Sequence, residues 1–211
     1  MANYEIHERI YQTIRAEGGQ GWGGAARLER APILLERLFS LPAVPVEGAL
    51  LELGCGEGNY ARLLHERGYQ VTGVDVAPTA IAWAQEKAAA LGYAIQFLQA
   101  DLSRPWTLAE GQFDLVVDGN CLHCIIGGDR QPFLANVWAA LRPAGLFFVS
   151  SLCSQSEQDR LTYRDDQPYR QIMAPAHLLA ELKAAGFGIE QSVIHPGEQS
   201  NHITIHARKL V

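Results

Sequence analysis

The sequence lacks the runs that would direct it to a membrane or to nucleic acid. No apolar stretch approaches the ~20 residues that a membrane-spanning helix needs, and the polar N-terminal stretch MANYEIHERIYQTIR has no apolar signal-peptide core. The chain also has no lysine- and arginine-rich run, and its formal net charge is −6. These absences predict a soluble, cytoplasmic protein without a nucleic-acid or membrane-surface partner.

Cysteine is also scarce. Four cysteines in 211 residues do not form a disulfide framework, so reduced thiols are expected at Cys55, Cys121, Cys124 and Cys153. Two of them fall in the stretch DGNCLHC (residues 118–124), whose Cys-x-x-Cys spacing matches half of a zinc site. Because His123 lies between the two cysteines and a second pair at suitable spacing is missing, we expect no metal here.

From residue 49 onward, short apolar runs alternate with helical patterns. Strands are predicted at ALLELG, YQVTGVDV, AIQFLQAD, FDLVVDG and LFFVSSL, and one of the intervening helices, RQPFLANVWAALRPAG, has Leu134, Val137, Trp138 and Leu141 on one face. This alternation implies a parallel sheet with right-handed crossovers. Residues 153–173 are expected to be irregular. After a further helix, GIEQSVIHP and HITIHARKL form an antiparallel hairpin, because GEQSN is too short for a crossover.

Two helical segments, residues 3–16 and 25–40, precede this pattern, with the glycine-rich stretch EGGQGWGG between them. We expect residues 1–46 to form an N-terminal helical cap or lid and residues 47–211 to form one globular domain. The glycine-rich stretch has two interpretations, a flexible link or a hinged lid in which Trp22 covers a ligand.

The most informative segment is LLELGCGEGNYARLL, which reads as a strand, a tight loop and a helix. Gly54, Gly56 and Gly58 allow a sharp turn and contact between a ligand and the backbone. Their G-x-G-x-G spacing differs from the G-x-G-x-x-G of dinucleotide loops. The carboxylate of Glu52 at the strand end disfavours a pyrophosphate and suits a ligand with a cationic amino group.

Two further carboxylates end the next two strands. Asp75 ends the second strand, where a carboxylate accepts hydrogen bonds from both hydroxyls of a ribose. Asp101 ends the third strand, within reach of an adenine amino group. The three strand ends therefore indicate a binding site for a nucleoside ligand with a charged amino group.

These motifs resemble those of class I S-adenosylmethionine (SAM)-dependent methyltransferases. Residues 51–58 resemble motif I, VTGVDVAPTAIAWA the ribose-binding motif, FLQADL the adenine-binding stretch and FDLVVDGNCLHCI motif IV, while LRPAGLFFVS has RPAG where KPGG is more usual. The resemblance implies an α/β, Rossmann-like fold with a seven-stranded, mostly parallel sheet, helices on both faces and an antiparallel last strand. It also implies methyl transfer from SAM to a small-molecule acceptor, with S-adenosyl-L-homocysteine (SAH) as product.

The resemblance further implies a cofactor site at the ends of the first four strands. Asp75 would bind the ribose, Asp101 the adenine, and the loop Gly54–Gly58 would lie under the methionine moiety. The full set of candidates is Glu52, Gly54, Cys55, Gly56, Gly58, Asp75, Val76, Asp101, Leu102, Asp118 and Asn120, with Trp22 from the cap.

Acceptor-binding candidates come from TYRDDQPYR, which follows the fifth strand and would lie over the ligand-binding edge of the sheet. They are Tyr163, Arg164, Tyr169 and Arg170, and the two arginines suit a carboxylate or phosphate on the acceptor. His123 follows the fourth strand and is the candidate general base. The alternative is that His123 hydrogen-bonds the cofactor carboxylate or a backbone group.

Three other functions stay open from the residues alone. They are a non-catalytic SAM-binding or regulatory protein, an NAD-dependent oxidoreductase, which the loop spacing disfavours, and a metal or metalloid handler built on Cys121, Cys124 and Cys153. The acceptor atom and the oligomeric state are open as well.

Overall fold

The computed structural model describes residues 4–106, 108 and 110–210. The strands are β1 (Gly48–Leu53), β2 (Tyr69–Asp75), β3 (Gln96–Gln99), β4 (Phe113–Asp118), β5 (Leu141–Cys153), β6 (Arg160–Arg164), β7 (Gln167–Ile172), β8 (Phe187–His195) and β9 (Asn201–Lys209). The helices are α1 (Glu5–Ala16), α2 (Gly24–Glu29), α3 (Ala31–Leu38), α4 (Asn59–Glu66), α5 (Pro78–Ala90), α6 (Arg130–Ala140) and α7 (Pro175–Ala184), with short 3₁₀ turns η1 (Leu122–Cys124) and η2 (Gly127–Asp129).

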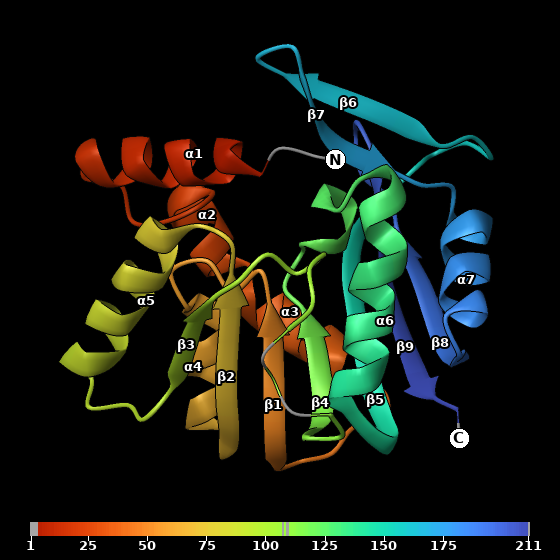
Figure 1. Ribbon diagram of the computed structural model, residues 1–211, viewed down its shortest axis with the longest axis horizontal. Helices are drawn as coiled ribbons and strands as arrows, with labels where there is room; N and C mark the ends of the chain where they lie inside the picture. The colour runs from red at the N-terminus through yellow and green to blue at the C-terminus, as the bar shows by residue number, and fades with distance from the viewer. Residues whose placement is uncertain (1–3, 107, 109, 211) are drawn as a thin grey trace.

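A seven-stranded sheet forms the centre, in the order β3-β2-β1-β4-β5-β9-β8 (Figure 1). Strands β1 to β5 pair in parallel, and β9 runs antiparallel to both β5 and β8. The prediction of a mostly parallel Rossmann-like sheet with an antiparallel last strand is therefore confirmed.

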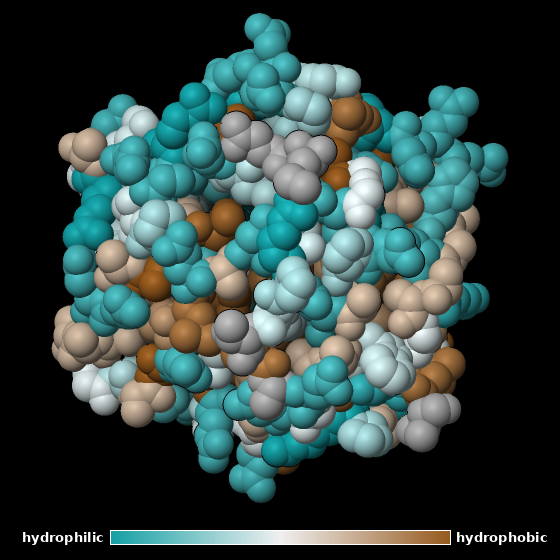
Figure 2. All heavy atoms as spheres, viewed as in Figure 1, coloured by the Kyte–Doolittle hydropathy of each residue, from teal (hydrophilic) through white to brown (hydrophobic). Residues whose placement is uncertain are grey.

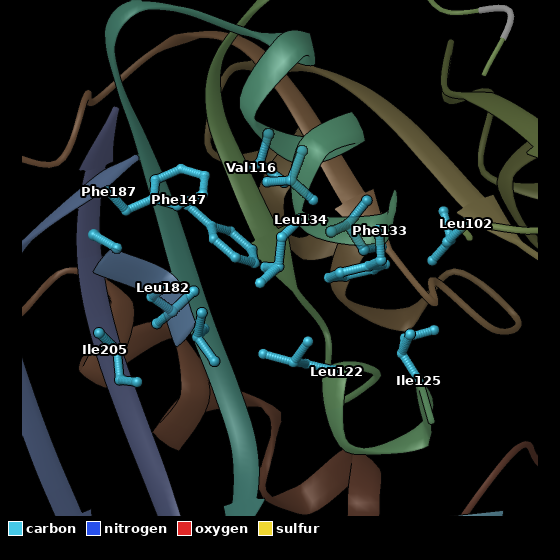
Figure 3. Packing of buried hydrophobic residues seen from close by; sticks show 14 of the residues in the cluster. Leu102, Val116, Leu122, Ile125, Phe133, Leu134, Phe147, Leu182, Phe187 and Ile205 are labelled. Carbon is cyan, nitrogen blue, oxygen red and sulfur yellow. The ribbon is translucent and has the colours of Figure 1, made fainter. Parts of the chain in front are cut away.

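Helices cover both faces of the sheet. Side chains of α3, α4 and α5 pack on one face, where Leu35 and Leu64 share a buried cluster with Leu50 of β1. On the other face α6 and α7 pack against the strands, and Leu134 and Phe187 lie in one cluster with Phe147 (Figure 3). The outer surface seen in Figure 2 is mainly hydrophilic, with apolar residues showing toward its centre. Burial of both faces explains the nearly continuous apolar runs of the central strands.

The sequence-based prediction of an irregular segment at residues 153–173 is wrong over β6 and β7. These strands form an antiparallel hairpin that makes its own two-stranded sheet. Asp165 and Asp166 connect them with φ angles of 49° and 57°. Aspartate tolerates this left-handed conformation better than most residues, so Asp-Asp between two short strands is a turn signal that the prediction did not use.

Two helix boundaries also differ from the prediction. The segment 25–40 divides at Arg30 into α2 and α3, and Pro32 occupies the first turn of α3, where its missing N–H costs no hydrogen bond. Helix α6 ends at Ala140, so Leu141 begins β5 and does not share a helix face with Trp138. Pro143 disfavours helical geometry in the residue before it, which explains the earlier stop.

The N-terminal segments lie in two places. Figure 1 shows α1 beyond the carboxyl ends of the parallel strands, on the same side as the β6–β7 hairpin. Helix α3 instead packs into the core, with Leu34, Leu35 and Leu38 all buried. The division into a cap (1–46) and a methyltransferase domain (47–211) stays a prediction, and residues 1–3 lie outside the described part. None of the described helices is long and apolar enough to cross a membrane.

Candidate active site

A cleft, partly open to solvent, lies at the carboxyl ends of β1 to β4. One end is lined from the sheet by Gly54, Asp75, Val76, Asp101 and Leu102, and the other by His123, Cys124, Ile125 and Arg170, with Gly119, Asn120 and Cys121 between them. Tyr4, His7, Tyr11, Trp22 and Arg27 line it from the N-terminal segments. The cleft thus lies where open α/β sheets bind their ligands.

The glycine loop after β1 requires glycine for two reasons. Gly54 and Gly56 have φ angles of 64° and 54°, which L-residues with a side chain rarely adopt. A Cβ on Gly54 would lie 2.6 Å from the Cβ of Cys121, and one on Gly56 would overlap the hydroxyl of Tyr11. The loop backbone therefore lies tightly between the β4 loop and α1. Cys55 and Gly58 are buried behind it and do not line the cleft.

Asp75 supports this loop and also faces the cleft. Its Oδ2 accepts a hydrogen bond from Gly56 N at 2.9 Å, and its Oδ1 accepts one from Ala77 N at 2.9 Å. Burial raises the pKa of Asp75 to about 6, although these backbone N–H groups oppose the rise. Each carboxylate oxygen keeps a further lone pair for a ligand hydroxyl.

Asp101 also lines the cleft, at the end of β3. Its Oδ1 accepts hydrogen bonds from Ser103 N at 2.9 Å and Ser103 Oγ at 2.6 Å, and Arg104 Nε lies 3.4 Å from its Oδ2. These contacts hold the carboxylate at the rim of the cleft beside Leu102. Among the described residues, the only contact of Oδ2 is the longer one to Arg104.

Two other predicted carboxylates lie behind the cleft wall. Glu52 and Asp118 are 1% and 0% exposed, and neither lines the cleft. Asp118 Oδ1 accepts hydrogen bonds from Cys121 N at 2.6 Å and Leu122 N at 3.1 Å, which shapes the turn that carries Asn120. Among the described residues, Asp118 Oδ2 and both oxygens of Glu52 have no hydrogen-bond partner. Burial raises the pKa of Asp118 to about 7 and that of Glu52 to about 8.

These raised pKa values predict that stability falls as pH rises. A folded state that keeps the Glu52 proton from its ordinary pKa of 4.5 up to about 8 binds more protons than the unfolded state in that window. The free energy of unfolding then drops by up to about 1.4 kcal/mol per pH unit for this group. Glu52→Gln removes this pH-dependent contribution. The free energy of unfolding of Glu52→Gln minus that of wild type should therefore increase between about pH 5.5 and pH 7.5, as measured by urea denaturation. Exposed Glu36→Gln is the control, and parallel curves for wild type and Glu52→Gln would contradict the assignment.

His123 lies on η1, directly after the β4 turn. Its neighbours Leu122 and Ile125 are anchored in the apolar core (Figure 3). The ring is 3% exposed, and its Nδ1 lies 3.4 Å from the donating Leu152 N and 3.3 Å from Ser151 Oγ. Burial, and then the positive charge of Arg170, lowers the pKa of His123 well below its ordinary value. His123 is therefore neutral at pH 7.

Aromatic residues of α1 and its flanks cover the cleft. Tyr4, His7 and Tyr11 follow an i, i+3, i+7 spacing, and Trp22 packs 5.1 Å from the ring of Tyr11. Trp22 N also points to Glu57 Oε2 of the glycine loop at 3.4 Å. The sequence-based prediction missed Tyr4, His7 and Tyr11 because it treated residues 3–16 only as a helix of the expected cap. The aromatic spacing was the signal that marks this face.

Arg27 is a further cleft residue that the prediction missed. Its Nη2 donates to Gly119 O at 2.9 Å, and its guanidinium lies 5.7 Å from the ring centre of Tyr60. Arg27 forms no ion pair with the described residues. No local pattern distinguishes it from other arginines, because its position depends on how α2 packs against the β4 loop.

Of the four acceptor candidates on the hairpin, only Arg170 lines the cleft. Tyr169 is buried and packs under the Arg170 guanidinium, with 4.7 Å between the guanidinium carbon and the ring centre. Arg164 lies 5.7 Å from the same ring on its outer side, and Tyr163 is 63% exposed. The hairpin thus presents one cation to the cleft.

The cysteines divide between the cleft and the core. Cys121 and Cys124 line the cleft, and burial raises the pKa of both thiols, so they are protonated at pH 7. Cys153 is fully buried in the core. Within residues 4–106, 108 and 110–210 no group of three or more His, Cys, Asp or Glu side chains is arranged to hold a metal ion.

Fold and cleft together define a Rossmann-like methyltransferase, and comparisons with known proteins agree. A family model described as a methyltransferase domain matches residues 50–145. An uncharacterized methyltransferase of Schizosaccharomyces pombe is 31% identical over 121 residues, which cover 57% of this chain and 81% of that protein. The chain belongs to the class I SAM-dependent methyltransferases. It is an enzyme with SAM as its methyl donor, which sets aside the NAD-dependent oxidoreductase and the non-catalytic SAM-binding protein.

Other relatives match in part. The 2-heptyl-1-hydroxyquinolin-4(1H)-one methyltransferase of Mycobacteroides abscessus is 34% identical over 105 residues, covering 49% of this chain and 46% of that protein. Among solved structures, 1,6-didemethyltoxoflavin-N1-methyltransferase of Burkholderia thailandensis has a TM-score of 0.76 and is 24% identical, covering 98% of this chain and 88% of that chain. This similarity to the Burkholderia thailandensis enzyme shows a shared fold.

Proposed function

We propose that this enzyme transfers the methyl group of SAM to a small-molecule acceptor bound in the cleft described above. The observation that carries the proposal is that one cleft joins the carboxyl ends of β1 to β3 with η1 and Arg170. The nucleoside end would hold the cofactor, and the η1 end the acceptor. The relatives named for quinolone and toxoflavin-type acceptors support a small acceptor for this chain too.

The nucleoside end suits an adenosine. Asp75 faces the cleft with free lone pairs for the two ribose hydroxyls, and Asp101 and Leu102 lie beside it for the adenine. Arg27 is positioned for the methionine carboxylate, since it is a cation without an ion-pair partner at the junction between the two ends. Glu52 lies buried behind Gly119 and is mostly protonated at pH 7, because burial raises its pKa to about 8; a cationic amino group in front of it would favour the charged carboxylate.

SAM supplies an electrophilic methyl group, so the protein's task is to position and to exclude water. The aromatic residues of α1 and Trp22 cover the cleft, while η1 holds the acceptor side rigidly through Leu122 and Ile125. Alignment of two reactants in this way contributes up to about 7–11 kcal/mol to lowering a barrier. No catalytic metal is part of the proposal.

An SAH-release assay tests the proposal. The purified enzyme is incubated with SAM and a panel of small acids, phenols, amines and thiols, and SAH is quantified. We expect release with at least one acceptor class and competition by SAH. The matched polymer arm contains transfer RNA and duplex DNA, for which we expect no release above background. Methylation of these polymers, with none of small molecules, would overturn the proposal.

A further inference from the structure

The side chains at the acceptor end of the cleft offer a positive charge, an N–H donor and aromatic rings, and together these indicate a class of acceptor. This inference rests on the proposed function. Its basis is three features of the described residues: a cation without a carboxylate partner, a histidine whose tautomer is determined by the backbone, and aromatic rings that line the cleft.

Arg170 is the cation. Its guanidinium contacts Tyr169 by stacking and by one long hydrogen bond of 3.4 Å from Nη2 to the Tyr169 hydroxyl. Its Nε is buried without a hydrogen-bond partner, and no described carboxylate pairs with it. The acidic residues that line the cleft, Asp75 and Asp101, are both at the nucleoside end. A buried cation without a carboxylate partner is costly, and an anionic ligand in the cleft would lower that cost.

The tautomer of His123 follows from its backbone neighbour. Leu152 N–H points at Nδ1 at 3.4 Å, and a backbone N–H only donates. Nδ1 therefore carries the lone pair, so the proton of the neutral ring is on Nε2. The side chain lines the cleft, and Nε2 has no hydrogen-bond partner among the described residues. His123 thus presents an N–H donor to the cleft.

The other titratable groups around the acceptor end also hold no base suited to pH 7. Burial lowers the pKa of His7 to about 4, and raises that of Cys124 to about 11. The pKa of Tyr4 is raised beyond the ordinary range of tyrosine. The charged and titratable groups that act on His123 from neighbouring elements are Arg170, His202, Arg27 and Arg130. An acceptor that must lose a proton would therefore have to lose it before transfer.

Aromatic rings of the N-terminal segments line the cleft as well. The rings of Tyr4 and His7 are stacked, 6.4 Å apart and inclined by 28°, and His7 also stacks on the buried ring of Tyr169, at 5.8 Å and 30°. Trp22 adds a ring 5.7 Å from His7. Such surfaces suit a planar ring by stacking. They would also suit a cation, but the guanidinium groups of Arg170 and Arg164 lie over the neighbouring ring of Tyr169 and would repel one.

We propose that the acceptor is a planar, conjugated acid that binds as its anion, with its ring against Tyr4 and His7 and its charge on Arg170 and His123 Nε2–H. Its proton goes to solvent before binding. In the transfer step a bond forms between the anionic acceptor atom and the methyl carbon while the carbon–sulfur bond breaks. The electron pair stays on sulfur, the charges of anion and sulfonium cancel, and His123 keeps its proton.

Four matched probes test the class by calorimetry on the enzyme saturated with SAH. They are 2-naphthoate (planar anion), 2-naphthamide (planar, neutral), 2-naphthylmethylammonium (planar cation) and decahydro-2-naphthoate (non-planar anion). We expect 2-naphthoate to bind about tenfold or more tightly than each of the others. Equal or tighter binding of the amide or the cation, or no binding of 2-naphthoate, would overturn the inference.

Substitutions of Arg170 test whether its guanidinium contacts the bound carboxylate. Arg170→Gln should weaken 2-naphthoate about tenfold and leave the SAH dissociation constant within about twofold, while Arg170→Lys keeps part of the affinity. Arg160→Gln, which removes a cation of the same hairpin whose contacts are to Gln199 and Ser200, is the control. An unchanged naphthoate affinity in Arg170→Gln would exclude the anion site.

His123 is tested with a donor and a non-donor replacement. His123→Gln should keep naphthoate affinity within about threefold, and His123→Phe should lose about tenfold. Long-range ¹H–¹⁵N spectra should show the Nε2–H tautomer throughout the range from about pH 5.5 to pH 8. Titration of His123 within that range would contradict the donor role. Loss of SAH binding by wild type would instead contradict the proposed cleft function, so the two failures are distinguishable.

Discussion

Replacing Asp75 by alanine is expected to weaken SAM binding by at least about 100-fold. The carboxylate faces the cleft at the end of β2, and two charge-assisted hydrogen bonds to ribose hydroxyls contribute about 1.5–3 kcal/mol each. In the wild type, Gly56 N and Ala77 N donate hydrogen bonds to Asp75, and the substitution leaves both without this acceptor. The glycine loop then loses the contact that holds it between β1 and β2. Calorimetric titration with SAM measures the effect directly.

The matched control is Asp114→Ala at the start of β4. Asp114 Oδ2 also accepts a backbone hydrogen bond, from Ala49 N at 2.9 Å, and its carboxylate pairs with Arg142 at the opposite edge of the sheet. Its loss should lower thermal stability without changing the dissociation constant of SAM. If Asp75→Ala binds SAM as tightly as Asp114→Ala, the cofactor assignment at β2 is wrong.

Replacing Arg27 by methionine should remove the preference of the enzyme for ligands with a methionine carboxylate. We expect SAH to bind about 10- to 100-fold more weakly, because a charge-assisted contact to the carboxylate is lost from a partly buried site. Methionine keeps the apolar stem that packs near Tyr60. The affinity for 5′-methylthioadenosine, which has neither carboxylate nor amino group, should stay within about twofold.

Exposed Arg30→Met, three residues further along the chain, is the control for the charge change. It should leave the affinities for both ligands unchanged. An equal loss of SAH and 5′-methylthioadenosine binding in Arg27→Met would mean that Arg27 supports the fold of the β4 loop through Gly119 O and does not contact the carboxylate.

The central strands could be predicted from the sequence because the patterns that mark them are local. Each of β1, β2 and β4 is a short apolar run with a carboxylate at or next to its end, at Glu52, Asp75 and Asp118, and each is followed by a loop and a helix. Burial on both faces demands apolar residues along the whole strand, so periodicity and punctuation suffice. The same reasoning located the loop Gly54–Gly58, since three positive φ angles leave little choice but glycine.

The β6–β7 hairpin and the aromatic residues that cover the cleft were harder to predict from the sequence. The β6–β7 strands are polar because they form a separate two-stranded sheet, so no apolar alternation marked them. Arg170 and Tyr163 stand in the same short segment, yet one lines the cleft and the other is exposed. Which side chain of a polar hairpin faces inward depends on how the hairpin rests on α1 and η1, and that is a tertiary relation.

For His123, too, the sequence predicted the position of the residue, whereas its protonation depends on the tertiary structure. Its place after β4 and a near-neutral reference pKa made it the candidate base, with a backbone hydrogen bond as the alternative. In the fold, Leu152 N–H occupies the direction of Nδ1 and the ring is buried, which favours a donor at Nε2. The tautomer depends on a strand 29 residues further along the chain. The types of the central elements and their succession along the chain thus follow from local hydrophobicity and backbone sterics. Side-chain orientation, desolvation and charge at the cleft arise only when distant segments pack together.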